Sequence, residues 1–220
     1  MRIPFARALT QRDFALLWLG QTTSLVGDGI FNVALAWQAL QLPDGAKVLG
    51  AVLLVRSAAR VALLLVAGAL ADRYEKRLLV LGGDTLQMVA VGWLAYVVGT
   101  GDLHTWQLVT VAGVTGAGSA IFLSASTAIV PELVDEDYYQ SANSLRSTSV
   151  VLSDLVGSAA GGLIVATAGI ATAFTVNAAT FVASITALLF VRPRRRAVAE
   201  TEENVFSQVK EGLRYVVRTP

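Results

Sequence analysis

The segment GALADRYEKR, residues 68–77, separates two long apolar stretches of the chain. Its last six residues, DRYEKR, carry five charges. A segment so rich in charge cannot lie in hydrocarbon, because each ionised side chain at the centre of a bilayer costs about 2.5–3.5 kcal/mol or more. A break between two membrane helices must also lie where water can hydrate its backbone. We therefore predict that residues 68–77 form a tight turn at a membrane surface between two spanning helices.

The composition of the whole chain agrees with this prediction. Of 220 residues, 55% are hydrophobic and 15% are charged, whereas soluble domains carry about 25% charged residues. The net charge of +1 gives no signal for binding nucleic acid, and the lack of cysteine excludes disulfides and thiolate metal sites. The sequence has no nucleophile–base set, phosphate-binding loop or metal-ligand spacing. We expect an integral membrane protein that is not an enzyme and needs no metal or other cofactor.

Six stretches provide the 20 or so mainly apolar residues that a spanning helix needs (about 30 Å of hydrocarbon). They are Phe14–Leu40, Val48–Ala71, Leu78–Val98, Thr105–Val130, Ser141–Ala166 and Ala171–Val191. The sequence thus predicts an all-α protein with a cytoplasmic arm (1–13), a six-helix transmembrane bundle (14–191) and a cytoplasmic linker (192–220). In the linker, Val205, Val209 and Leu213 are spaced as on one helix face, which predicts an amphipathic helix at the membrane surface.

The basic residues near the helix ends predict how the chain is oriented, because Lys and Arg gather on the cytoplasmic side. The side that holds both ends of the chain would carry Arg2, Arg7, Arg12, Arg73, Lys76, Arg77, Arg192, Arg194, Arg195 and Arg196. The other side has only Lys47. We therefore expect a multi-pass protein of the inner (plasma) membrane, with both ends of this chain in the cytoplasm.

Residues 68–77 resemble the loop between helices 2 and 3 of major facilitator transporters. That loop reads Gly, three residues, Asp-Arg, one residue, Gly and then basic residues. The matching positions here are Gly68, Asp72, Arg73, Lys76 and Arg77, while Glu75 stands where the family usually has Gly. The resemblance implies that these residues form a conformational switch, in which Asp72 helps to hold the cytoplasmic side closed.

Two further segments resemble the drug:proton antiporters of this superfamily. The run GSAAGG, residues 157–162, is similar to their helix 5 motif at Gly157, Gly161 and Gly162, although Ser158 replaces the motif's proline. The end of their helix 4 motif resembles residues 116–120, but Gly113 replaces its arginine, so no role of that arginine is carried over. Residues 131–134, followed by Ala142-Asn143, are similar to a loop of the macrolide-efflux and enterobactin-exporter branch.

The resemblance implies a fold and an activity. Family members have twelve helices in two halves, each a 3+3 inverted repeat, so this chain would be one half plus the start of the central linker. It could be a fragment, a truncated frame or a short protein that dimerises; its partner would be a second six-helix half. The implied activity is proton-coupled efflux of a hydrophobic or amphipathic small molecule, of the drug or siderophore class, by alternating access. An importer of the same fold, or a non-transporting scaffold or assembly subunit, is the alternative.

Four ionisable residues fall deep within the predicted helices, namely Asp28, Arg56, Arg60 and Asp154. Such residues are candidates for function, because burying a charge in a membrane is costly. Asp28 also shares one helix face with Gln21, Ser24 and Asn32. We interpret Asp28, Arg56, Arg60, Asp154, Gln21 and Asn32 as a pathway for substrate and protons. A buried ion-pair lattice that joins helices 1, 2 and 5 is the structural alternative.

Small residues predict where the helices pack closely. Gly116 lies on a ridge with Ala112, Ala120 and Ser124, and residues 157–161 form a GxxxG pattern. Such ridges let helix backbones approach in lipid. We predict that Gly116, Gly157, Gly161 and Gly162 pack against neighbouring helices. Asp84 and Arg146 are expected nearer the cytoplasmic surface, where a gate contact and simple interfacial placement suit them equally.

Overall fold

The computed structural model describes residues 4–192, without the side chains of the first residues, of Leu65 and of Asp72. Every regular element in it is helical. The elements are η1 (Pro4–Thr10), α1 (Arg12–Gln41), α2 (Gly45–Arg73), α3 (Lys76–Thr100), α4 (Thr105–Ala128), α5 (Val130–Leu133), η2 (Glu136–Tyr138), α6 (Tyr139–Ala168) and α7 (Ile170–Leu189). The structure confirms the all-α fold. The predicted amphipathic helix at 205–218 lies outside the described residues.

Six of these helices are long and match the six predicted stretches within a few residues. Four helical stretches within the described residues are long and apolar enough to cross a membrane by length and composition: Lys76–Thr100, Thr105–Ala128, Glu136–Ala168 and Ile170–Leu189. The predicted order of six helices is present, while membrane spanning by α1 and α2 stays a prediction.

A helix boundary that the sequence did not predict lies after α4. The sequence predicts one helix up to Val130, but α4 ends at Ala128 and a separate short helix, α5, begins at Val130. The cause is Pro131, which has no N–H to donate to the carbonyl oxygen four residues earlier and whose ring clashes with that carbonyl, whereas the first turn of a new helix tolerates both features. The predicted loop after helix 4 therefore contains α5 and η2 instead of irregular chain only.

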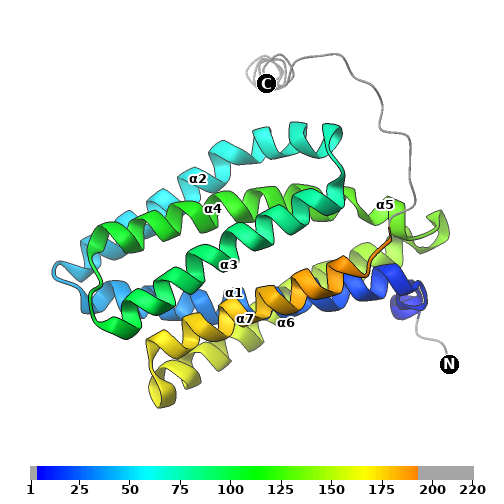
Figure 1. Cartoon of the computed structure of the whole chain (residues 1–220). Coiled ribbons are helices and arrows are strands. Elements are labelled where there is room, and N and C mark those ends of the chain that lie inside the picture. The colour runs from blue at the N-terminus through cyan, green and yellow to red at the C-terminus, as the bar shows by residue number, and fades with distance from the viewer. Residues whose placement is uncertain (1–3, 193–220) are drawn as a thin grey trace, which may run out of the picture.

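The long helices pack as two groups of three that lie side by side (Figure 1). One group consists of α1 packed on α6 and α7, and the other of α4 packed on α2 and α3. The two groups meet mainly where α3 lies along α7. Exchanging α1 with α4, α2 with α6 and α3 with α7 converts the contacts of α1 with α6 and α7 into those of α4 with α2 and α3, and leaves the contact between α3 and α7 unchanged. The packing therefore has the exchange symmetry of two matching three-helix units.

The turn between α2 and α3 and the segment between α4 and α6 lie at one end of the bundle, together with the start of α1 and the end of α7 (Figure 1). Hydrogen bonds join these segments: the backbone N–H of Arg192 donates to Asp13 Oδ1 over 3.1 Å, and Gln11 Nε2 donates to Asp135 Oδ2 over 3.4 Å. The turns at the opposite end include Gly101 and Gly169, which have positive φ of 82° and 86°. Within the described residues, the basic positions predicted to share one side therefore share one end.

Three of the four predicted packing glycines lie at close helix contacts. A Cβ atom added at Gly116 would lie 2.3 Å from the carbonyl oxygen of Arg56, where α4 crosses α2. On α6, a Cβ at Gly157 would lie 2.3 Å from the carbonyl oxygen of Val26, and one at Gly161 would lie 2.9 Å from Ile30 Cα. Gly162 has nothing within 4 Å of such an atom among the described residues. It points away from α1 because one residue along a helix turns the side chain by about 100°.

Candidate functional site

The predicted pathway residues of α1 and α2 lie together. The half-buried carboxylate of Asp28 interacts electrostatically with Arg56 and Arg60 across the contact between these helices. None of the ion pairs within 4.0 Å among the described residues includes Asp28. The Arg56 guanidinium donates a hydrogen bond to Asn32 Oδ1 and lies over the Phe31 ring, 5.2 Å from its centroid. The site is thus a group of charges held near one another without direct ion pairing.

Asp154 does not belong to this group. It is exposed on α6, whereas its neighbour Ser153 is buried and donates a hydrogen bond to the carbonyl oxygen of Thr22 on α1 over 3.4 Å. Because successive residues differ by about 100° around a helix, the side chain of Asp154 leaves the α1 contact. Within the described residues, the ion-pair lattice considered for helices 1, 2 and 5 is therefore not formed.

A buried carboxyl group that the sequence placed near the surface lies at the junction of the two helix groups. Asp84 on α3 is 0% exposed, and its Oδ2 accepts a hydrogen bond of 2.7 Å from Ser184 Oγ on α7. Its Oδ1 has no partner among the described residues, and neither does the buried Nδ2 of Asn177 on α7. The sequence could not reveal this burial, since it depends on how α3 pairs with α7. An unpaired carboxylate is costly to bury, which makes Asp84 a further candidate for a functional group.

The turn at residues 68–77 is fixed to its own six-helix unit. Lys76 Nζ forms an ion pair of 2.6 Å with Glu132 Oε1 on α5. Arg77 donates hydrogen bonds of 3.0 and 2.8 Å to the carbonyl oxygens of Leu188 and Leu189 at the end of α7. Cations stabilise a helix C-terminus because its last carbonyls are unpaired and carry partial negative charge. Two buried nitrogens of Arg73 find no acceptor within the described chain.

We predict that Lys76→Met lowers the free energy of unfolding by about 1.5–3 kcal/mol, the range of a hydrogen bond to a charged group. The side chains of this pair are only 25% and 12% exposed, so that water screens them weakly. The matched control is Lys47→Met, which removes an ion pair to Asp44 whose side chains are 82% and 69% exposed; such pairs contribute little. Thermal unfolding in detergent measures both. Equal effects of the two substitutions would contradict the prediction, and a Lys76→Glu, Glu132→Lys double variant should restore stability.

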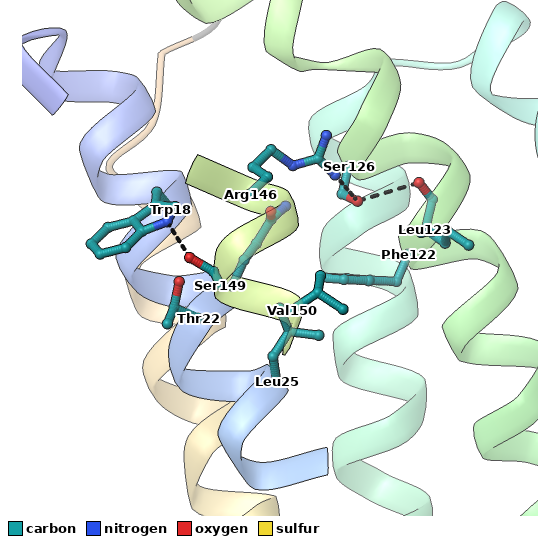
Figure 2. A pocket seen from close by; sticks show the side chains of 10 residues that line it. Trp18, Thr22, Leu25, Phe122, Leu123, Ser126, Arg146, Ser149 and Val150 are labelled. Atoms are coloured by element: carbon teal, nitrogen blue, oxygen red, sulfur yellow. Dashed lines mark hydrogen bonds between the residues drawn. The ribbon is translucent and has the colours of Figure 1, made fainter. Parts of the chain in front are cut away.

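A pocket of about 370 Å³ opens between α1, α4 and α6 (Figure 2). Its lining residues are Trp18, Gln21, Thr22, Leu25, Phe122, Leu123, Ser126, Arg146, Ser149 and Val150. Trp18 Nε1 donates a hydrogen bond of 2.7 Å to Ser149 Oγ, and Arg146 donates one of 3.2 Å to Ser126 Oγ. Of the predicted pathway residues only Gln21 lies here. The aromatic walls could not be recognised from sequence, because they come from helices far apart in the chain.

Comparison with known proteins finds relatives that match almost the whole of this chain. A family model described as transmembrane secretion effector matches residues 4–220. The uncharacterized MFS-type transporter YfiS of Bacillus subtilis is 31% identical over 218 residues, which cover 96% of this chain and 50% of that protein. The multidrug efflux pump Tap of Mycolicibacterium fortuitum is 28% identical, covering 93% of this chain and 52% of the pump. Macrolide efflux protein A of Streptococcus pyogenes is 26% identical over 65% of this chain and 36% of its own length. The chain thus spans about half the length of YfiS and Tap.

Proposed function

The chain belongs to the transmembrane secretion effector family of major facilitator transporters, a family of transporters and not of enzymes, and we propose that it works in proton-coupled export of a hydrophobic or amphipathic small molecule. The observation that carries the proposal is the family match over residues 4–220. The similarity to two kinds of efflux pump supports the direction of transport and the class of substrate. The multi-pass helices place the protein in a lipid bilayer.

The mechanism that we propose is alternating access, in which two six-helix halves rock around a site near the middle of the membrane. The half-length coverage of relatives supports a complementary half, supplied by a C-terminal continuation or by another chain. The exchange symmetry of the helix contacts supports a 3+3 inverted repeat within this half. All six long helices, including α1 and α2, would then span the membrane, with the charges of α1 and α2 facing the shared interior.

The turn at residues 68–77 would contact the second half in one conformation of the transporter and lose that contact in the other. Lys76 and Arg77 attach the turn to α5 and α7, so that it moves with its own half as a unit. We propose that Asp72 faces the positive end of a helix in the second half when the cytoplasmic side is closed. Separation of the halves would break that contact and open the cytoplasmic side.

Transport by everted membrane vesicles tests the proposed function. In everted vesicles, export from the cell becomes uptake, and two fluorescent naphthyl amphiphiles, one neutral and one with a carboxylate, report it. We expect uptake when the vesicle interior is acidified, and its loss when a protonophore collapses the proton gradient. Vesicles without the protein are the control. Gradient-driven movement in the opposite direction would indicate an importer, and intact assembly of the protein without any gradient-dependent flux would favour a scaffold.

The proposed orientation has a separate test, which the absence of native cysteine makes clean. Single cysteines replacing Asp44 and Asp102 should react in intact cells with a thiol reagent that cannot cross the membrane. Cysteines replacing Glu75 and Glu136 should react only after the cells are opened, because both lie in turns at the end that we assign to the cytoplasm. Labelling at position 75 in intact cells would reverse the orientation.

A further inference from the structure

We propose that the pocket between α1, α4 and α6 binds the anionic head of an amphipathic organic molecule, and that Arg146 is the residue that selects the negative charge. The proposal rests on the proposed export function and narrows its substrate to amphiphiles with a carboxylate or a similar anionic acceptor group. It is carried by two features of the pocket: unused hydrogen-bond donors on one part of its lining and aromatic and aliphatic side chains on the rest (Figure 2).

The polar part of the pocket is rich in donors and has no acidic side chain in its lining. Arg146 lies half-buried, and its partners within the described chain are the neutral hydroxyls of Ser126 and Thr127, at 3.2 and 3.4 Å. A guanidinium has five donors, so that these two contacts leave much of its capacity unused. The buried Nε2 of Gln21 and Oγ1 of Thr22 also have no partner among the described residues. An anionic acceptor would satisfy these donors and neutralise the one charge of the lining.

The apolar part of the pocket is suited to a flat or branched hydrocarbon body. Trp18 on α1 and Phe122 on α4 contribute aromatic rings from two helices, and Leu25, Leu123 and Val150 add aliphatic surface. The hydrogen bond from Trp18 to Ser149 holds the indole ring in place, which reduces the ordering that a ligand would have to impose.

Two kinds of molecule share this chemistry: a free amphipathic carboxylate and the phosphate head of an anionic lipid. Arg binds both well, because its planar fork matches carboxylate and phosphate oxygens. If Arg146 had only a structural role, the protein would not prefer a charged ligand over a neutral ligand of the same shape. That difference in preference is what an experiment can measure.

The experiment compares a naphthylalkyl carboxylate with its primary amide, a neutral ligand of nearly the same shape. Binding to the full chain is measured by equilibrium titration in nanodiscs of neutral phosphatidylcholine, without any proton gradient. We expect the wild-type protein to bind the carboxylate at least about tenfold more tightly than the amide, as a hydrogen-bonded charge pair would give. Arg146→Gln should remove this preference while leaving amide binding unchanged. Arg146→Lys should keep part of it, and Lys47→Gln, a charge change in an exposed turn, should have no effect.

The outcomes separate this inference from the proposed function. A carboxylate preference that survives Arg146→Gln, or its absence from the wild-type protein, would overturn the inference even if gradient-driven export is intact. Lost export with an intact carboxylate preference would count against the export function alone. If Arg146→Gln fails to assemble, two other variants test the role of Arg146. Loss of the preference for the carboxylate over the amide in Trp18→Leu, together with undiminished carboxylate binding in Arg146→Lys, would overturn that role. Displacement of the carboxylate by added phosphatidylglycerol, dependent on Arg146, would confirm the anionic site and assign it to a lipid headgroup.

Discussion

Replacing Gly157 by alanine is expected to force α1 and α6 apart and to destabilise the bundle by about 1–3 kcal/mol or more, the usual cost of overpacking. The added Cβ would lie 2.3 Å from the carbonyl oxygen of Val26 and 3.0 Å from Gly29 Cα. Both atoms belong to the backbone of α1, which cannot move aside as a flexible side chain could. In a membrane, close backbone approach is itself a main source of helix association, so the loss should exceed that of any surface substitution.

The same substitution five residues further along α6 provides the control. Gly162 has no atom within 4 Å of an added Cβ among the described residues, and alanine is favoured over glycine in a helix by about 1 kcal/mol. Thermal unfolding of the detergent-solubilised protein should therefore show a lower midpoint temperature for Gly157→Ala and no lower midpoint temperature for Gly162→Ala. Gly116→Ala should behave like Gly157→Ala, because its Cβ would lie 2.3 Å from the carbonyl oxygen of Arg56. Equal stability of the Gly157 and Gly162 variants would contradict the observed packing.

Asp28→Asn is expected to abolish gradient-driven transport while exchange of substrate without a gradient continues. The substitution keeps the size of the side chain but removes its charge and its capacity to take up and release a proton. Asp28 lies near Arg56 and Arg60 in this structure, and we propose that it takes up a proton when alternating access separates it from them. Coupling of protons to transport requires such a difference between the two states, since a group with equal proton affinity in both states cannot shift the equilibrium between them.

Expression separates this role of Asp28 from a structural one. Removing one member of a buried ion pair typically costs about 3–5 kcal/mol, but Asp28 belongs to none of the ion pairs within 4.0 Å among the described residues, and Arg56 would keep its hydrogen bond to Asn32 and its contact with the Phe31 ring. We therefore expect Asp28→Asn to reach the membrane at a normal level. Asp154→Asn, at an exposed position on α6, is the matched substitution and should have the smaller effect. Normal expression of Asp28→Asn with full gradient-driven transport would contradict the proposal and make Asp154 the next candidate.

The sequence by itself determined the helices, their order and the family. These properties depend on local features: apolar runs of helical length, turn residues such as Pro43 and Gly101, and the spacing of Gly68, Asp72 and Arg73. The boundary between α4 and α5, which the sequence analysis did not predict, also has a local cause, because Pro131 disrupts the helix only within one turn. The residues around Asp28 could also be proposed, because Gln21, Asp28 and Asn32 share a face of one helix, which the period of 3.6 residues fixes.

Only the tertiary structure decided which faces of different helices meet. Gly157 and Gly162 belong to one motif, yet of these two only Gly157 packs against α1. Asp28 and Asp154 both fall deep within predicted helices, yet only Asp28 lies near the arginines of α2. The burial of Asp84 against Ser184 and the pocket around Arg146 join segments 100 and more than 120 residues apart. Periodicity gives the direction of a side chain relative to its own helix, but the rotation of that helix against its neighbours follows from how all the close backbone contacts fit together.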